Sequence, residues 1–147
     1  MAIYRSIPLK FWQDRKVSDE FSADDRFIFL YLLTNPHTNT CGCYEISAKQ
    51  ISRDTGLAQK RVDKALQRLW QEHRVIMFDS DNEEVLIRNW HKYNWNSSKV
   101  ATAVRNQAKD IKNNSFRDYV LDTLSIQYPY GIDTTDTVTD TDTVPCL

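Results

Sequence analysis

The chain has 147 residues, 41% hydrophobic and 12% aromatic, and its formal net charge of −1 suits one globular domain of ordinary size followed by a tail. The longest apolar run, residues 27–33, is too short to cross a bilayer, and the N-terminus lacks the apolar core of a signal peptide, so we expect a cytoplasmic protein with no membrane partner. The charge is divided unevenly, because residues 1–46 carry −1, residues 47–117 carry +6 and residues 118–147 carry −6. A basic middle followed by an acidic end is typical of nucleic-acid-binding proteins with an acidic tail.

A helix is expected from Ser22 to the Asn35–Pro36 step. Ser22 is a good N-cap, and the acidic pair that follows it favours the positive end of the helix dipole. Seven successive apolar residues come next, so most of the helix surface should be covered, which makes it the central scaffold of the fold and places Leu30 in the core. The candidate core contacts that precede this helix are Phe11, Trp12, Val17 and Phe21.

Two helices joined by a glycine turn form the centre of the pattern. Ser47 is expected to cap a short helix that runs to about Thr55, with Gln50 completing a capping box. Gly56 supplies the turn, because glycine adopts a positive φ without a Cβ penalty, and a second helix is expected over residues 58–72. This arrangement is the helix-turn-helix signature. The small core between the two helices should contain Ile51, Leu57, Val62, Leu66 and Leu69.

The second of these helices has an apolar side and a cationic side. At 100° per residue, Val62 and Leu66 fall on one side, and Lys60 and Lys64 fall on the other. Lys and Arg neutralise phosphates and Gln pairs with base edges, so the cationic side suits entry into the major groove of DNA. An ordinary solvated helix face explains this helix alone about equally well. The candidate DNA-binding residues are Lys49, Gln59, Lys60, Arg61, Lys64, Gln67, Arg68, Arg88 and Lys92.

A β-hairpin is expected directly after the second helix. Residues 75–78 and 85–87 are short apolar runs around a polar loop, and residues 43–46 are a plausible third strand. A hairpin after a recognition-type helix is the wing of a winged helix. The sequence therefore predicts a mainly α fold with a small β-hairpin, a winged helix-turn-helix domain that spans residues 1–96.

The expected tip of this wing is acidic. Its four carboxylates would repel phosphate, so we expect the tip to point away from DNA and to be free to meet a basic surface of another copy or of a partner. Arg88 and residues 90–95 should then lie nearer to the DNA, although the rings of Trp90 and Tyr93 are expected to serve mainly in packing. The carboxylates belong to Asp79, Asp81, Glu83 and Glu84.

A helical extension is expected over residues 97–127, packed on the first domain. Ser97 or Ser98 should cap its first helix, Asn113–Asn114 should break it, and Ser115 should begin the last helix. Residues 128–147 form a Thr/Asp-rich tail that should be disordered, because it cannot bury enough apolar surface to offset the entropy of ordering.

Catalysis and metal binding are not expected. The cysteines Cys41, Cys43 and Cys146 form no metal-ligand spacing with the three histidines, so free thiols are the favoured interpretation, and no cofactor is predicted. The sequence contains no glycine-rich phosphate loop, no nucleophile motif and no HExxH pattern, which argues against an enzyme.

Four stretches carry a likeness to a known family: FWQD at residues 11–14, DRFIFLYLLTNPHTNTCGCYEIS at 25–47, KQISRDTG at 49–56 and NWHKYNW at 89–95. Together they resemble the N-terminal domain of phage replisome organisers, which are replication-initiation proteins related to the bacterial primosomal DnaD family. The likeness covers roughly residues 1–125. The block LYLLTNPHTNTCGCYEIS is rather specific, whereas a helix-turn-helix alone is not.

The resemblance implies a winged-helix domain that binds double-stranded origin DNA, self-associates into a homo-oligomer and helps to recruit the replicative helicase or its loader. It places Lys49, Lys60, Lys64 and Arg68 where the recognition region of a family member touches DNA. Winged helices also serve in transcription, and the likeness favours replication over a transcriptional regulator by about two to one. A third alternative is a protein-interaction module whose winged helix only dimerises.

Overall fold

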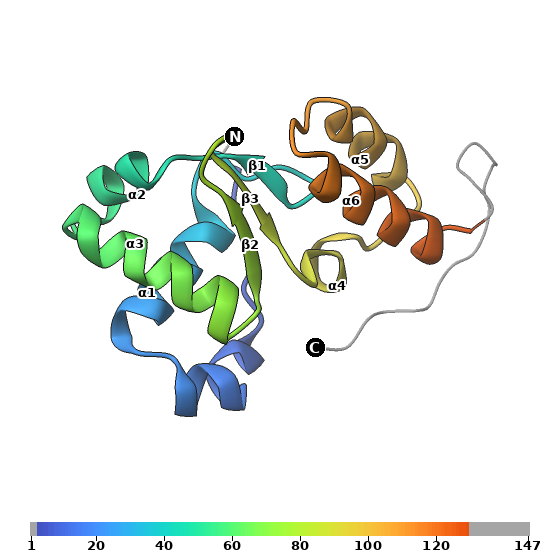
Figure 1. Ribbon diagram of the computed structural model, residues 1–147. Coiled ribbons are helices and arrows are strands. Elements are labelled where there is room, and N and C mark those ends of the chain that lie inside the picture. The colour runs from blue at the N-terminus through green and yellow to red at the C-terminus, as the bar shows by residue number, and fades with distance from the viewer. Residues whose placement is uncertain (1–2, 130–147) are drawn as a thin grey trace.

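A three-stranded antiparallel sheet lies at the centre of the chain, in a computed structural model that describes residues 3–129 (Figure 1). The strands are β1 (Cys43–Glu45), β2 (Ile76–Asp79) and β3 (Glu84–Ile87), in the order β1-β3-β2. The α-helices are α1 (Ala23–Thr34), α2 (Ala48–Thr55), α3 (Gln59–Gln67), α4 (Trp90–Asn94), α5 (Val100–Ala108) and α6 (Asn114–Gln127). Three short helical segments complete the set: the 3₁₀ turn η1 (Leu9–Gln13) and the π-helical η2 (Lys16–Glu20) and η3 (Arg68–Glu72). The fold is therefore mainly α with a small antiparallel sheet, as the sequence predicts.

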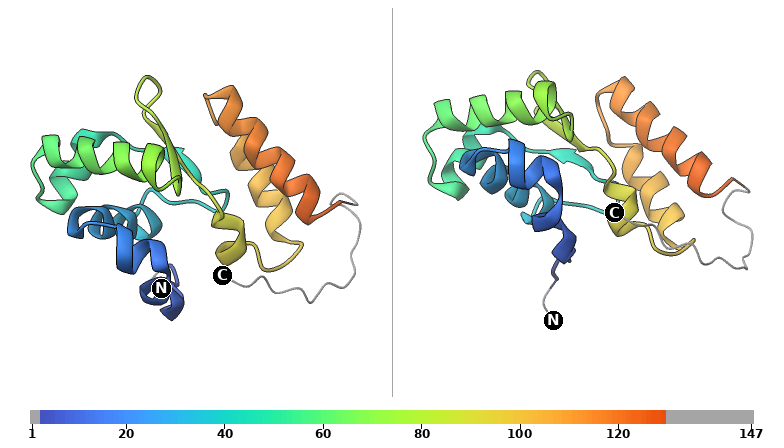
Figure 2. Two further views of the ribbon diagram at one scale, coloured as in Figure 1. Left: turned by 60° about the horizontal axis from the view of Figure 1, so that its bottom comes forward. Right: turned by 90° about the horizontal axis from the view of Figure 1, so that it is seen from below.

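The sheet lies between two groups of helices. Helices α1–α3 lie on one side and α4–α6 on the other, in the view of Figure 1 and in both views of Figure 2. All four residues of the central strand β3 are buried, which is the pattern of a strand covered on both faces. Cys43 on β1 and Met77 on β2 both pair with Leu86, so the register joins all three strands at the middle of the sheet.

Helix α1 is the scaffold on one side of this sheet, and its cap is stronger than expected. Ser22 and Asp25 form a full capping box, in which each side chain accepts a hydrogen bond from the other's backbone N–H. Ile28 and Leu32 are fully buried, whereas Phe27 is 45% exposed and Leu30 is only half-buried. The prediction of a core Leu30 is wrong, because one side of α1 faces away from the sheet despite its apolar residues.

The segment before α1 also departs from the prediction at one position. Phe11, Val17 and Phe21 are buried, and Phe11 and Phe21 pack against Phe29 of α1. Trp12 is 55% exposed and contacts Phe11 edge-on, so it lies outside the core.

The α2–α3 pair follows the predicted pattern closely. Ser47 Oγ accepts from the Gln50 backbone N–H at 3.0 Å, but the Gln50 side chain donates to Asp54, so the expected capping box is only half formed. Gly56 ends α2 with φ of +82°, a value that L side chains rarely adopt. The second helix ends in a π-helical turn at Glu72 instead of continuing as regular α-helix.

The C-terminal helices begin at positions that the sequence did not indicate. Neither serine caps α5, whose first turn is held by Val100 N–H and Ala101 N–H donating to the carbonyls of Ser97 and Ser98. The cap of α6 is Asn113, whose side chain accepts from the Phe116 N–H, so the expected start at Ser115 is wrong. The short helix α4 was not predicted. Most of the predicted tail, residues 130–147, lies outside the described residues.

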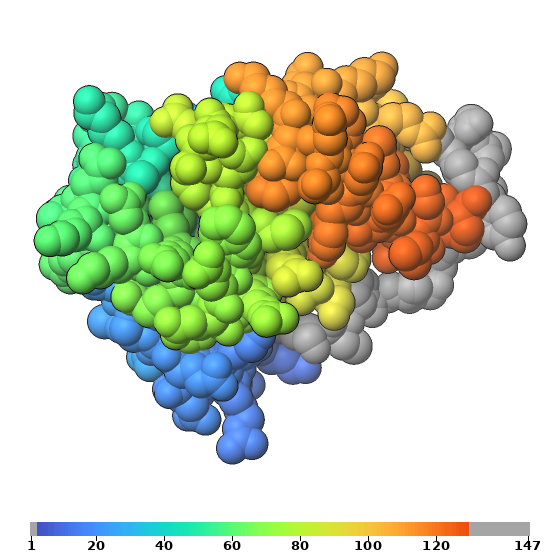
Figure 3. Space-filling view, in the orientation of Figure 1, coloured from blue at the N-terminus to red at the C-terminus, as the bar shows by residue number. Residues whose placement is uncertain are grey.

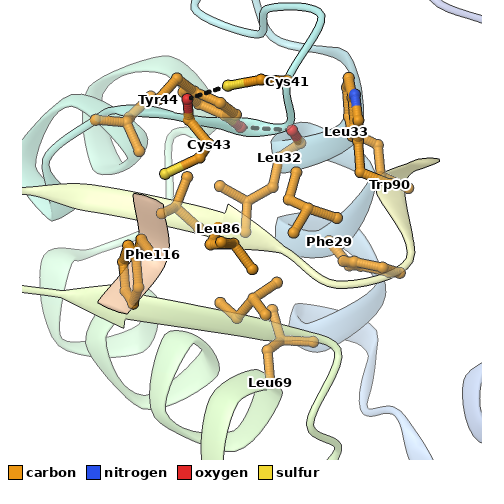
Figure 4. Close-up of a cluster of buried hydrophobic side chains, with 14 of the residues drawn as sticks. Phe29, Leu32, Leu33, Cys41, Cys43, Tyr44, Leu69, Leu86, Trp90 and Phe116 are labelled. Atoms are coloured by element: carbon orange, nitrogen blue, oxygen red, sulfur yellow. Dashed lines mark hydrogen bonds between the residues drawn. The ribbon is translucent and has the colours of Figure 1, made fainter. Parts of the chain in front are cut away.

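The loop before β1 is held by two tryptophans, Trp90 at the start of α4 and Trp95 just after it, and Figure 4 shows Trp90 beside the buried cluster. Trp90 Nε1 and Trp95 Nε1 both donate to the Thr40 carbonyl, at 2.9 and 2.8 Å. Gly42 has φ of +80°, and a Cβ there would overlap the Trp90 ring. Both indoles are buried, so these rings serve in packing, as expected for Trp90. Within residues 3–129, no helix combines the length and apolarity needed to span a membrane.

Replacing Leu66 with alanine should destabilise the fold by about 2–5 kcal/mol, because its side chain is buried between α3 and the rest of the core. Leu30→Ala should cost clearly less, since Leu30 is only half-buried. Chemical denaturation of the two variants measures both effects. Equal shifts of the midpoint would show that the burial difference between these two leucines is not real.

Candidate nucleic-acid interface

One side of α3 is a polar surface that no other part of residues 3–129 covers. Gln59, Lys60, Lys64 and Gln67 are exposed, while Val62 and the residues that share its side are buried. Within the described residues, the Lys60 and Lys64 side chains take part in no hydrogen bond or ion pair, and Gln67 bonds only to Gln71, at 3.3 Å. We call Lys60, Lys64 and Gln67 the α3 surface.

Arg61 lies next to this surface but is held within the chain. Its Nε and a terminal nitrogen donate to the two carboxylate oxygens of Asp24, at 2.9 and 2.7 Å. These hydrogen bonds from Arg61 are the main cause that lowers the pKa of Asp24. This bidentate pair fixes the plane of the Arg61 guanidinium against the first turn of α1.

Arg68 is also engaged, in a cluster around a buried carboxylate. Asp25 is 1% exposed, and its Oδ1 lies 2.8 Å from Arg68 Nε. Its Oδ2 lies 3.1 Å from Nε2 of the buried His73. The cluster ties the start of α1 to both ends of η3. Removing one member would leave an uncompensated buried charge, so Arg68 serves the fold in this conformation.

The remaining predicted residues lie elsewhere. Lys49 is exposed in the first turn of α2. Arg88 directly follows β3, and Lys92 belongs to α4, the helix that lies on the other side of the sheet from α3 in Figure 1. Arg88 lines a groove of about 400 Å³ between the N-terminal segment and α4, with an apolar floor that includes Phe11. The structure therefore does not bring Arg88 and Lys92 together with the α3 surface.

The acidic turn between β2 and β3 is not a free tip. Glu84 is 2% exposed, and its two carboxylate oxygens accept from the backbone N–H groups of Lys112 and Asn113, at 2.7 and 2.8 Å. Asp79 accepts from the side chains of Asn82 and Asn113, and these hydrogen bonds lower its pKa. The expectation of four free carboxylates is wrong, because two of them dock the turn on the loop between α5 and α6.

Only Asp81 and Glu83 of the four carboxylates remain exposed at the turn. The space-filling view places this turn between the α3 region and the start of α6, on one face of the molecule (Figure 3). Lys112 of the α5–α6 loop pairs with Glu45 of β1 at 2.7 Å. Contact of the turn with another copy or a partner stays a prediction, and only Asp81 and Glu83 remain available for it.

Sequence reasoning missed the residues that decide which α3 cations are free. From the sequence, Asp24 and Asp25 were interpreted only as residues that stabilise the helix dipole. Their partners, Arg61 and Arg68, lie 37 and 43 positions further along the chain. Glu84 was interpreted as part of a turn. Local residue spacing does not identify partners that are distant in the sequence. The one feature that indicated buried ion pairs was the presence of two adjacent carboxylates at the start of α1, a helix that is otherwise mostly apolar.

Comparison of the chain with protein-family models, curated proteins and solved structures found no match.

Replacing Arg61 with glutamine should weaken DNA binding less than the matched change Lys60→Gln. Arg61 is held by Asp24, whereas Lys60 is unpaired within the described residues. Losing one phosphate contact should make the slope of log K against log salt less steep by about 0.9 for Lys60→Gln, and by less for Arg61→Gln. Fluorescence anisotropy titrations at several salt concentrations measure both slopes. A larger loss for Arg61→Gln would mean that the Asp24 pair opens when DNA binds.

Proposed function

We propose that the chain is a winged helix-turn-helix protein that binds double-stranded DNA through the α3 surface. In this proposal α2 and α3 form the helix-turn-helix, and the β2–β3 hairpin takes the place of the wing. The observation that carries the proposal is the difference among the cations of α3 and the adjoining η3. Lys60 and Lys64 are exposed and unpaired within the described residues, whereas Arg61 and Arg68 are bound to Asp24 and Asp25. Lysines without an internal partner neutralise phosphates without first breaking an ion pair.

The dimensions of α3 support entry into a major groove. With η3 it extends for about 20 Å at 1.5 Å per residue, and a B-DNA major groove of about 12 Å width admits one α-helix. Gln67 lies on the same side as the two lysines, where its amide suits a base edge. In this proposal Lys49, exposed in the first turn of α2, contacts a flanking phosphate. We assign the acidic turn no direct contact, because Asp81 and Glu83 would repel phosphate.

The resemblance to replisome organisers supports a role in replication initiation without catalysis. In that role the chain binds origin DNA, self-associates, and meets a helicase or its loader. Exposed apolar side chains near the N-terminus favour self-association, because large apolar groups on a surface mark contacts with other proteins. These side chains are Ile3, Tyr4, Leu9 and Trp12.

Two measurements test the proposal in order. Anisotropy titration of a random-sequence duplex at low salt tests whether the chain binds DNA at all. If it self-associates in sedimentation but binds no duplex, it is a protein-interaction module. A footprint on the genome that encodes the chain then separates the two DNA-binding roles. Protection inside a replication origin supports replication initiation, and protection of a promoter supports a transcriptional regulator.

A further inference from the structure

Helix α5 carries a second cationic surface that the proposed α3 contact does not use. At 100° per residue, its buried residues Ala101, Val104 and Ala108 fall within an arc of about 60°. The exposed polar residues fall within an arc of about 120° on another side. We call this set the α5 surface, and it consists of Lys99, Thr102, Arg105, Asn106 and Lys109.

The cations of the α5 surface are not used by the fold. Within residues 3–129, no hydrogen bond or ion pair involves the side chain of Lys99, Arg105 or Lys109. The α5 surface itself contains three cations and no carboxylate, and the carboxylate that follows it in sequence is Asp110. An unbalanced cationic surface of this kind attracts a polyanion.

The composition of the α5 surface favours a phosphate backbone over an acidic protein. Protein interfaces are centred on aromatic or other large apolar side chains that fill pockets on the partner, and this surface has none. Lys, Arg, Thr and Asn are instead residue types that contact DNA phosphates. Sequence information is not read by such contacts, so the surface suits any duplex.

The α5 surface and the α3 surface are held apart by the sheet. Helix α5 lies on the opposite side of the sheet from α3 in Figures 1 and 2. Gln107 Oε1 accepts from the Cys41 N–H at 2.9 Å, which fixes α5 to the loop before β1. Glu84 fixes the α5–α6 loop to β3 through two hydrogen bonds. The two surfaces therefore belong to two separate groups of helices, one on each side of the sheet.

We propose that the α5 surface is a second DNA phosphate-binding site, so that one chain holds two separate duplex segments, one on α3 and one on α5. The bridging claim rests on the proposed function, which supplies the first contact. The result is a protein that brings two segments of DNA together.

A two-duplex capture experiment tests this inference. A biotinylated duplex is immobilised, the full chain is added, and retention of a second, fluorescent duplex is measured at low salt. The test variant is Arg105→Gln with Lys109→Gln. The matched control is Lys10→Gln with Arg15→Gln, which changes the net charge equally at exposed positions near the N-terminus. Melting curves confirm that both variants fold.

The test variant should still bind the first duplex. Its retention of the second, fluorescent duplex should fall about tenfold, because two phosphate contacts are removed. The control should capture the second duplex as the wild type does. Capture by the test variant at the wild-type level would overturn the inference. At a chain concentration where sedimentation shows only monomer, an equimolar mixture of the test variant with Lys60→Glu, Lys64→Glu should not restore capture. Restoration under that condition would overturn the claim that both sites act on one chain.

Failure of the proposed function gives a different result. If Lys60→Glu, Lys64→Glu captures the second duplex normally while the α5 variant does not, the α5 surface stands and the α3 assignment is wrong. If neither the wild type nor any variant binds a duplex at low salt, both are overturned.

Discussion

The double variant Lys60→Glu, Lys64→Glu is expected to lose several kcal/mol of DNA-binding free energy, a drop in affinity of at least about 100-fold. Each substitution removes a phosphate contact and adds a negative charge that faces the backbone. Neither lysine takes part in an interaction within the described residues, so the fold should be unaffected. If wild type contacts about five to seven phosphates, log K should fall against log salt with a slope of about −5 to −6, and the variant's slope should be less steep by about 2.

The control for this variant is Lys10→Glu with Arg15→Glu, which makes the same change in net charge on exposed residues away from α3. It should lower affinity only through long-range repulsion, an effect that disappears at physiological salt. Anisotropy titrations at several salt concentrations measure the DNA affinity of each variant and the slope of log K against log salt. If the Lys60→Glu, Lys64→Glu variant binds DNA with wild-type affinity and has an unchanged melting curve, α3 is not the DNA contact.

The variant Glu84→Leu is expected to destabilise the protein by about 2–4 kcal/mol. Leucine has a similar size but accepts no hydrogen bond, so the N–H groups of Lys112 and Asn113 would lose their partners next to the buried face of the sheet. A fully buried N–H group without a partner costs about 1–3 kcal/mol, and these two hydrogen bonds are part-buried, so the lower part of that range applies to each. Urea denaturation measures the loss, and amide exchange at Lys112 and Asn113 should show reduced protection.

Asp81→Leu is the matched control, because it makes the same chemical change at an exposed carboxylate of the same turn. Its effect should stay within about 0.5 kcal/mol. If Glu84→Leu unfolds at the same urea concentration as Asp81→Leu, the docking of the α5–α6 loop on β3 contributes nothing to stability.

The elements that local chemistry specifies were predictable from the sequence. Ser22 and Ser47 mark helix starts, Gly56 marks the turn between α2 and α3, and the apolar spacing around Val62 identifies the buried side of α3. These signals act over four residues or fewer, so one sequence contains all the information needed. The side of α3 that carries Lys60 followed from the same spacing.

Contacts between distant residues were not predictable in this way. Arg61 and Arg68 were assigned to DNA because their type and position on α3 fit, but Asp24 and Asp25 of α1 bind them in the folded chain. Glu84 looks like a turn residue until the α5–α6 loop is placed over it. A helix pattern gives the angular position of a side chain and says nothing about the charge on the neighbouring element. Leu30 was misplaced for the same reason, because a run of apolar residues does not reveal which side of α1 remains uncovered.

The central claim is that α3 contacts DNA, and amide NMR of the full chain during titration with a short duplex tests it most directly. The account predicts that the largest shift changes fall on residues 59–67, with smaller changes at Lys49, and that they weaken as salt is raised. Changes confined to α4 and the N-terminal groove, with the α3 amides unmoved, would contradict it.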